Sequence, residues 1–240
     1  MSIAALAPVA HCSLWRVDLD ATPSAEAAAC LSDEEWARAQ RFVFARDRRR
    51  FVAAHAALRS ALAAHTGMPG GFLDFKAGPF GKPALVEPAE VRFNLSHSAS
   101  VALIAIGADT EIGVDVELVR PMADAPALAE AHFTEAERHA LAHVAPEERD
   151  RAFLRGWTRK EACLKAAGVG LGLDTRTFDV GLDAGEREVR IELDDGTMRL
   201  TLASFDGGPG VVCAVARVLS TEARTAMRTA PAAQENELFA

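Results

Sequence analysis

The sequence predicts a mixed α+β fold in two halves, each with a helical section and about three strands. Two observations lead to this prediction. Helix-start signals with helical spacing of apolar residues occur before residue 67 and again after residue 134, and strand-like runs follow each helical section. The pattern breaks at Arg120-Pro121, so we predict halves over 1–119 and 120–220 and a flexible tail over 221–240. A chain of 240 residues is long enough for two small packed units.

The first half is predicted to begin with a strand and two helices. Ser32 and Glu35 have the spacing of a capping box that opens a helix. A second helix over 48–65 carries apolar residues near helical spacing and ends at Gly67. The stretch 67–90 is rich in glycine and proline, which is typical of loops. Strands are predicted over 14–19, 91–95, 101–106 and 112–118.

The second half repeats this order with different residues. Thr134 and Glu137 again have capping-box spacing. Pro146 suits the first turn of a further helix, which is predicted to end at Gly168. Strands are predicted over 178–182, 188–193, 198–203 and 211–218, with a tight turn at 195–196.

Composition is that of a globular protein with a core, because 50% of the residues are apolar and 25% are charged. The four cysteines are scattered without CxxC spacing, as expected in a reducing compartment. The N-terminal residues make a poor signal peptide and no apolar run is long enough to span a bilayer, so we expect a cytoplasmic protein without a membrane partner. The net charge of −8 argues against a nucleic-acid partner.

Positive charge is concentrated in one segment. Between Arg38 and Arg50 lie six arginines and one acid, Asp47. Such a run is typical of a solvated helix face, and it also suits a binding site for a polyanion. Phosphate chemistry elsewhere in the chain would favour the second interpretation.

Asp115 and Glu117 lie two apart in an apolar strand, so the strand period points both carboxylates to one face. Two adjacent carboxylates repel each other unless a cation lies between them, and their oxygens suit Mg²⁺. The alternative is a solvent-facing strand with incidental acids.

The segment from Trp157 to Lys165 carries a second set of charged residues. On a helix, Trp157, Glu161 and Lys165 step by four and share a face. Glu161 and Lys165 could form only a surface ion pair. The neighbouring tryptophan suggests instead that this face is partly buried, where charges need a metal or phosphate partner.

Ser96 and His97 follow each other at the end of a predicted strand. No GxSxG elbow surrounds either serine of this segment, and adjacent residues on an extended chain point to opposite faces. A loop that receives an anion therefore suits the segment better than a catalytic serine–histidine pair. A structural histidine remains the alternative.

Four motifs of this sequence resemble the signature set of Sfp-type phosphopantetheinyl transferases, both in their order along the chain and in their approximate spacing. They are Gly81-Lys82-Pro83, Phe93 to Ser98, Gly113 to Glu117, and Trp157 to Lys165. The resemblance covers about residues 31 to 182. It implies a single-chain pseudo-dimer of two similar halves, each a small antiparallel sheet with packed helices, with coenzyme A bound in the cleft between them.

The resemblance also implies roles for individual residues. Mg²⁺ would be held by Asp115, Glu117 and Glu161. Coenzyme A would be contacted by Arg50, Lys82, Ser96, His97, Lys160 and Lys165. Among these, Arg50 and Lys82, with Ser96, would hold the nucleotide end and its 3′-phosphate, whereas His97 would contact the pyrophosphate. Glu161, Lys165 and Asp115 would be catalytic, with Glu161 as the base, directly or through a metal-bound water.

The implied reaction transfers 4′-phosphopantetheine from coenzyme A to a serine of an apo acyl, polyketide or peptidyl carrier protein and releases 3′,5′-ADP. The alternatives are a Mg²⁺-dependent nuclease or phosphodiesterase, and a non-catalytic module that binds coenzyme A or a carrier. A pseudo-dimer has little reason to self-associate, so we expect a monomer. Neither the carrier nor tolerance for acylated coenzyme A is predicted. Around the first helix, where the family often has lysines, this sequence has Arg38 and Arg41, and which of the two contacts a phosphate is not predicted. Arg46, Arg48 and Arg49 have no motif assignment and could guide an acidic carrier.

Overall fold

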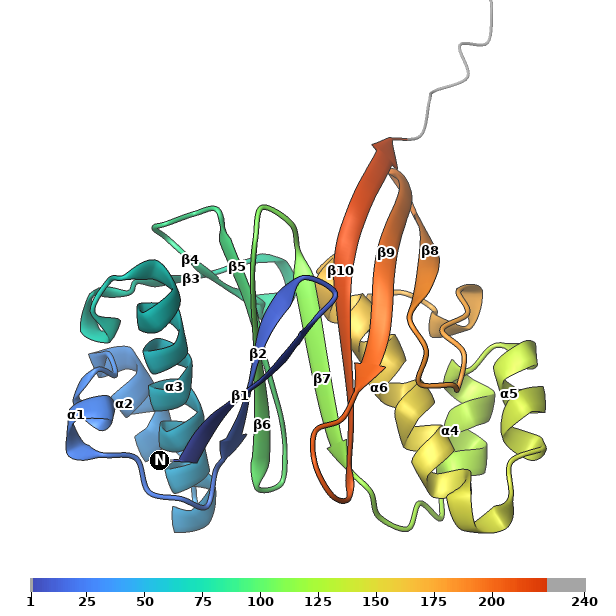
Figure 1. Ribbon diagram of the computed structural model, residues 1–240, viewed down its shortest axis with the longest axis horizontal. Coiled ribbons are helices and arrows are strands. Elements are labelled where there is room, and N and C mark those ends of the chain that lie inside the picture. The colour runs from blue at the N-terminus through green and yellow to red at the C-terminus, as the bar shows by residue number, and fades with distance from the viewer. Residues whose placement is uncertain (1, 224–240) are drawn as a thin grey trace, which may run out of the picture.

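Two four-stranded antiparallel sheets pack face to face between two outer groups of helices in the computed structural model, which describes residues 2–223 (Figure 1). The first sheet has the order β1-β2-β6-β5, with β1 Ser2–Val9, β2 Cys12–Asp18, β6 Val101–Ala108 and β5 Val91–Ser98. The second has the order β7-β10-β9-β8, with β7 Ile112–Leu118, β10 Val211–Ala223, β9 Gly196–Phe205 and β8 Arg187–Leu193. A small separate ribbon joins β3 Phe75–Ala77 to β4 Pro83–Leu85.

The helices lie on the outer faces of both sheets (Figure 1). The first group is α1 Ala25–Ala29, α2 Asp33–Gln40 and α3 Ala45–Thr66, and the second is α4 Ala125–His132, α5 Glu135–Ala142 and α6 Arg149–Ala167. Short 3₁₀ helices are η1 Gly70–Phe72, η2 Pro79–Gly81, η3 Pro146–Glu148, η4 Gly170–Gly172 and η5 Thr175–Thr177. Across residues 2–223, no helix is both long enough and apolar enough to cross a membrane.

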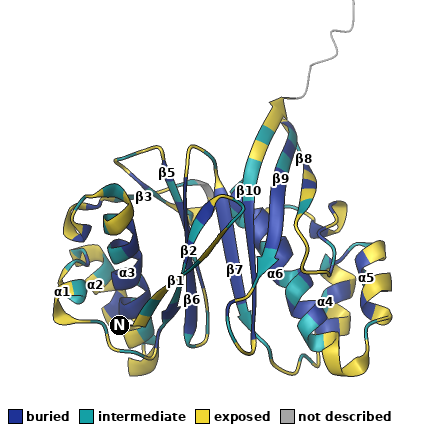
Figure 2. Cartoon of the chain, viewed as in Figure 1, coloured by how far each residue is buried: buried dark blue, intermediate teal, exposed yellow. Residues whose placement is uncertain are grey.

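Three apolar clusters hold these layers together. One lies between α3 and the first sheet and includes Leu58 and Ile104, and a second lies between α6 and the second sheet and includes Leu164 and Leu200. The third lies between the two sheets and contains residues of both. Burial is accordingly concentrated in the sheets and on the inward faces of α3 and α6 (Figure 2). The predicted fold of two halves, each an antiparallel sheet with packed helices, is confirmed.

Both predicted capping boxes are present, and each serves a second purpose. Glu35 caps α2 and also forms an ion pair with Arg59 of α3, with 2.8 Å between Glu35 Oε2 and Arg59 Nε. Glu137 caps α5 and pairs with Lys160 of α6, with 2.9 Å between Oε2 and Nζ. The two halves therefore tie a short helix to a long helix by the same device, which is consistent with a pseudo-dimer.

The predicted strand over 178–182 is wrong, because this segment is an irregular loop. Phe178 and Val180 are buried there, as strand residues would be. Their backbone groups bond to side chains instead of to a neighbouring strand: Val180 N–H donates to Glu137 Oε1 at 2.7 Å, and Arg159 Nε donates to Val180 O at 2.7 Å. The apolar residues alone could not show this.

The chain passes from the first sheet to the second earlier than the predicted boundary at 119/120. β7 pairs with β10, so this strand belongs to the second sheet, and the change comes at the turn 109–111. The break at Pro121 is real but only separates β7 from α4. Of the predicted tail over 221–240, residues 221–223 continue β10 and residues 224–240 lie outside the described part of the chain.

Candidate active site at the junction of the two sheets

The edge strands β5 and β7 meet where the two sheets join. Side chains of alternate β5 residues bond to β7: Asn94 Oδ1 accepts from the Val114 N–H at 2.8 Å, and Ser96 Oγ donates to Asp115 Oδ1 at 2.7 Å. Ser98 Oγ donates to a β7 carboxylate as well, at 2.7 Å from Glu117 Oε2. This ladder of side chains takes the place of backbone pairing and fixes both carboxylates of β7.

The two faces of β7 divide as the strand period predicts. Val114 and Val116 pack between the two sheets, whereas Asp115 bonds to α6 on the opposite face. Gly113 lies on that same face directly under the helix, because a Cβ placed on it would lie 2.8 Å from Lys165 Cβ and nearer still to the α6 backbone. A residue without a side chain is needed for so close an approach.

Asp115 and Lys165 form the central ion pair. Lys165 Nζ lies 2.6 Å from Asp115 Oδ1 and also donates to Ser96 Oγ at 3.0 Å. Burial raises the pKa of the Asp115 carboxyl, while the charge and hydrogen bond of Lys165 oppose that rise. Lys165 therefore supplies the counter-charge that keeps a buried carboxylate at this position.

Glu161 lies one helical turn before Lys165 on α6 and is half-buried. Within residues 2–223 its carboxylate has neither a hydrogen-bond partner nor an ion pair. Burial and the negative charges of Asp115 and Glu117 raise the pKa of Glu161, against the opposing charge of Lys165. The site thus pairs Asp115 with Lys165 and Glu117 with Arg120, and it leaves Glu161 unpartnered among the described residues.

The chemistry of this donor set fits a hard cation. Carboxylate oxygens are suitable ligands for Mg²⁺, and a bound cation would offset the repulsion between neighbouring carboxylates. The described part of the chain nevertheless contains no ready-made cluster of three such ligands. Lys165 pairs with Asp115, and Arg120 Nη1 lies 2.8 Å from Glu117 Oε2. The predicted metal ligands Asp115, Glu117 and Glu161 therefore remain a prediction.

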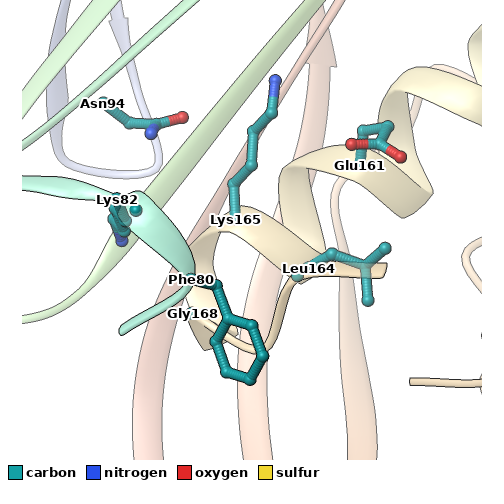
Figure 3. Close-up of a pocket in the computed structure, with 9 residues that line it drawn as sticks. Phe80, Lys82, Asn94, Glu161, Leu164, Lys165 and Gly168 are labelled. Carbon is teal, nitrogen blue, oxygen red and sulfur yellow. The ribbon is translucent and has the colours of Figure 1, made fainter. Parts of the chain in front are cut away.

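A cavity of about 280 Å³ opens beside Glu161 and Lys165, with Phe80 and Lys82 across from them (Figure 3). Lys82 Nζ donates to Glu111 Oε2 at 2.7 Å and to Ile112 O at 2.8 Å. Burial lowers the pKa of Lys82, although Glu111 opposes this shift. The predicted residues Lys82 and Lys165 therefore lie on one cavity with the unpartnered carboxylate.

A second cavity, of about 450 Å³, lies on the other face of β5, toward α3. Its lining includes Arg38, Phe42, Arg50, Phe51, His55 and His97. Partial burial, Lys165 and His55 lower the pKa of His97. Arg50 makes two hydrogen bonds to Asp20, at 2.7 and 3.0 Å. Ser96 and His97 thus point to opposite faces of β5, as predicted, and the predicted anion-binding residues divide between the two cavities.

Lys160 does not lie where the prediction placed it. Its side chain is buried, with 2% of the residue exposed, and Nζ lies 2.9 Å from Glu137 Oε2. The same amine donates to Thr175 O at 2.7 Å and to Phe178 O. Consecutive helix residues point about 100° apart, so Lys160 leaves the face shared by Glu161 and Lys165. It holds the loop before β8, and we exclude it from the phosphate-binding residues.

Sequence reasoning missed several residues that shape the site. Asn94 and Ser98 share the period of two with Ser96, and this alternation was the available signal. Arg120 follows Glu117 by three residues and gave no such signal. His55 lies inside a helix and faces the second cavity only because of how α3 packs. Within the basic run, Arg38 and Arg50 line that cavity, whereas Arg46 pairs with Asp47 at 3.1 Å.

Two family models match the chain. The model described as "4'-phosphopantetheinyl transferase superfamily" matches residues 111–216. The model described as "4'-phosphopantetheinyl transferase, N-terminal" matches residues 20–109. They adjoin at the turn where the chain passes from the first sheet to the second.

Individual proteins are similar over much of the same region. The 4'-phosphopantetheinyl transferase HetI of Nostoc sp. is 41% identical over 163 residues, which cover 66% of this chain and 69% of that protein. A putative 4'-phosphopantetheinyl transferase of Synechocystis sp. is 39% identical over 145 residues, which cover 60% of this chain and 59% of that protein. The 4'-phosphopantetheinyl transferase Sfp of Bacillus subtilis is 26% identical over 185 residues, which cover 77% and 81%.

Proposed function

The chain belongs to the 4′-phosphopantetheinyl transferase superfamily, and we propose that the junction of β5, β7 and α6 is the centre of its reaction. The family transfers phosphopantetheine from coenzyme A to carrier proteins, and this chain is such a transferase. One observation carries the choice of site: Asp115 pairs with Lys165 beside a cavity, and the carboxylate of Glu161, one helical turn away on α6, has no partner within residues 2–223. Family membership decides against both the nuclease and the non-catalytic binding module.

Coenzyme A carries a pyrophosphate and a separate phosphate on its ribose, and the chain offers a cavity lined by basic side chains on each side of edge strand β5. Lys165 and Lys82 line the first cavity, next to the carboxylates. Arg38, Arg50 and His97 line the second. We assign the pyrophosphate to the first cavity and the nucleotide end to the second. In this assignment Lys82 contacts the pyrophosphate and His97 the nucleotide end, which reverses the roles that the resemblance implied for these two residues, whereas Arg50 keeps its role at the nucleotide end.

The reaction moves one phosphoryl group. The hydroxyl oxygen of the carrier serine attacks the β-phosphate and forms a new P–O bond. The bond to the α-phosphate oxygen breaks, so 3′,5′-ADP leaves with that oxygen. Glu161 accepts the serine proton, directly or through a metal-bound water, because its carboxylate has no partner within residues 2–223. The charge on the phosphoryl oxygens is offset by Lys165, which acts from a fixed position.

Asp115, Glu117 and Glu161 would hold Mg²⁺, which when bound supplies positive charge to the phosphoryl oxygens. Ser96 and Ser98 keep the two β7 carboxylates on the α6 side of the strand. Which carrier the protein modifies stays open, and a cytoplasmic monomer stays a prediction.

Intact-protein mass spectrometry tests this function. The purified protein is mixed with coenzyme A, Mg²⁺ and a panel of apo acyl, polyketide and peptidyl carriers. We expect one carrier or more to gain the mass of a single phosphopantetheine, and we expect EDTA to abolish the gain. A carrier whose serine is replaced by alanine serves as the control and should stay unmodified. Absence of a gain on every carrier of the panel would count against the proposal.

A further inference from the structure

His55 lines the second cavity, and its ring is hydrogen-bonded to the carboxylate of Glu35. It lies on α3, and its Nδ1 is 2.7 Å from Glu35 Oε1. Its ring packs on Phe51, with 4.0 Å between ring centroids and 30° between planes. The Arg38 guanidinium lies over the same phenyl ring, 5.3 Å from its centroid. Phe51 therefore positions the side chains of His55 and Arg38 beside one cavity.

Glu35 fixes which nitrogen of His55 is available. Burial opposes ionisation of Glu35, but hydrogen bonds from His55 and the Ser32 N–H, with the charge of Arg59, hold its pKa at about 2. A carboxylate that stays ionised accepts hydrogen bonds only, so the Nδ1 of His55 must carry the proton. Nε2, on the opposite edge of the ring, is left to a ligand.

One positive charge on the cavity wall, that of Arg38, has no carboxylate partner among the described residues. Arg50 is committed to Asp20, with 2.7 Å between Nε and Oδ1. Within residues 2–223, Arg38 has no carboxylate partner, and His97 lies on the same cavity wall. Asp47 also lines the cavity and pairs outward with Arg46. A phosphate monoester dianion fits such a set of donors, because it can accept charge-assisted hydrogen bonds from several of them.

We propose that His55, oriented by Glu35, is a further phosphate-binding residue of this cavity and makes the enzyme select coenzyme A over dephospho-coenzyme A. The inference rests on the proposed function, because it takes coenzyme A as the ligand. In this arrangement Nε2–H donates to the 3′-phosphate, while Nδ1–H stays on Glu35. Dephospho-coenzyme A lacks this phosphate and leaves the contact unmade.

Isothermal titration of the full chain with coenzyme A and with dephospho-coenzyme A tests the inference. We expect the unchanged protein to prefer coenzyme A, and we expect His55→Gln to reduce that preference about 10- to 100-fold, since a charge-assisted hydrogen bond is lost. Glutamine can still donate to Glu35, so thermal unfolding of the variant should match the parent. His55→Arg keeps a cation beside Glu35 and should retain most of the preference.

The matched control is His65→Gln, which changes an exposed histidine at the C-terminal end of the same helix. It should leave both affinities unchanged. A His55→Gln variant that is folded and keeps the full preference for coenzyme A would overturn the inference while leaving the proposed function intact. Absence of coenzyme A binding by the unchanged protein would instead overturn the proposed function, and the inference with it.

Discussion

Replacement of Gly113 by alanine tests whether the close approach of β7 and α6 assembles the catalytic groups. The added methyl carbon would lie 2.8 Å from Lys165 Cβ, below the 3.0 Å that real Cβ contacts respect, and nearer still to Ala162 O and Ala166 N. Two of these three neighbours are backbone atoms, so no side-chain rotation relieves the clash. The helix must move away from the strand, and overpacking of this kind costs about 1–3 kcal/mol of stability.

The same movement separates the reacting groups. Lys165 Nζ lies 2.6 Å from Asp115 Oδ1 and 3.0 Å from Ser96 Oγ, so a retreat of the helix lengthens both contacts. Because misplacement by about 1 Å can cost about 10²-fold in rate, we expect Gly113→Ala to lose activity beyond its loss of stability.

The assay combines urea unfolding with the rate of carrier modification at saturating coenzyme A. Gly71→Ala is the control, because a Cβ there meets nothing nearer than 4.0 Å. We expect the control to keep the parental stability and rate. If Gly113→Ala also kept the parental stability and rate, this would refute the inference that the missing side chain of Gly113 allows α6 to approach the carboxylates of β7.

Three further changes address other parts of the account. Ser98→Ala removes the hydrogen bond to Glu117, so we expect a loss of about 1 kcal/mol in unfolding free energy and a lower kcat; an unchanged kcat would show that this serine does not position the carboxylate. Lys160→Met leaves Glu137 buried without its cation, so we expect the free energy of unfolding to fall by about 3–5 kcal/mol. The KM for coenzyme A should stay unchanged, and a raised KM would show that Lys160 belongs to the phosphate-binding residues. The pKa of Glu35 falls from 4.5 to about 2 on folding, so its contribution to stability is complete above pH 4.5 and is lost as the pH falls toward 2. Glu35→Gln should therefore flatten the acid limb of a plot of unfolding free energy against pH, and an unaltered limb would contradict the assignment.

The features that the sequence predicted correctly depend on neighbours along the chain. The capping box of Ser32 and Glu35 needs only a spacing of three residues, and the common face of Asp115 and Glu117 needs only the period of a strand. Both could therefore be seen without knowledge of the fold. The helical spacing of Glu161 and Lys165 is of the same kind.

The features that it could not predict depend on contacts between distant segments. β7 belongs to the second sheet because it pairs with β10, almost a hundred residues later, and no local pattern records that choice. The loop at Phe178 and Val180 has buried apolar residues like a strand, but side chains from α5 and α6 satisfy its backbone. Lys160 was placed by motif alone, although helical geometry already turns it away from Glu161.

Single-turnover transfer by Glu161→Gln tests the central claim most directly, because the account makes this unpartnered carboxylate the base. The matched control is Glu147→Gln, which changes an exposed glutamate in η3. With the best carrier of the panel, we expect Glu161→Gln to slow transfer by about 10²-fold or more while coenzyme A binding stays detectable, and we expect the control to match the parent. Transfer by Glu161→Gln at the parental rate would contradict the account and remove Glu161 from the mechanism.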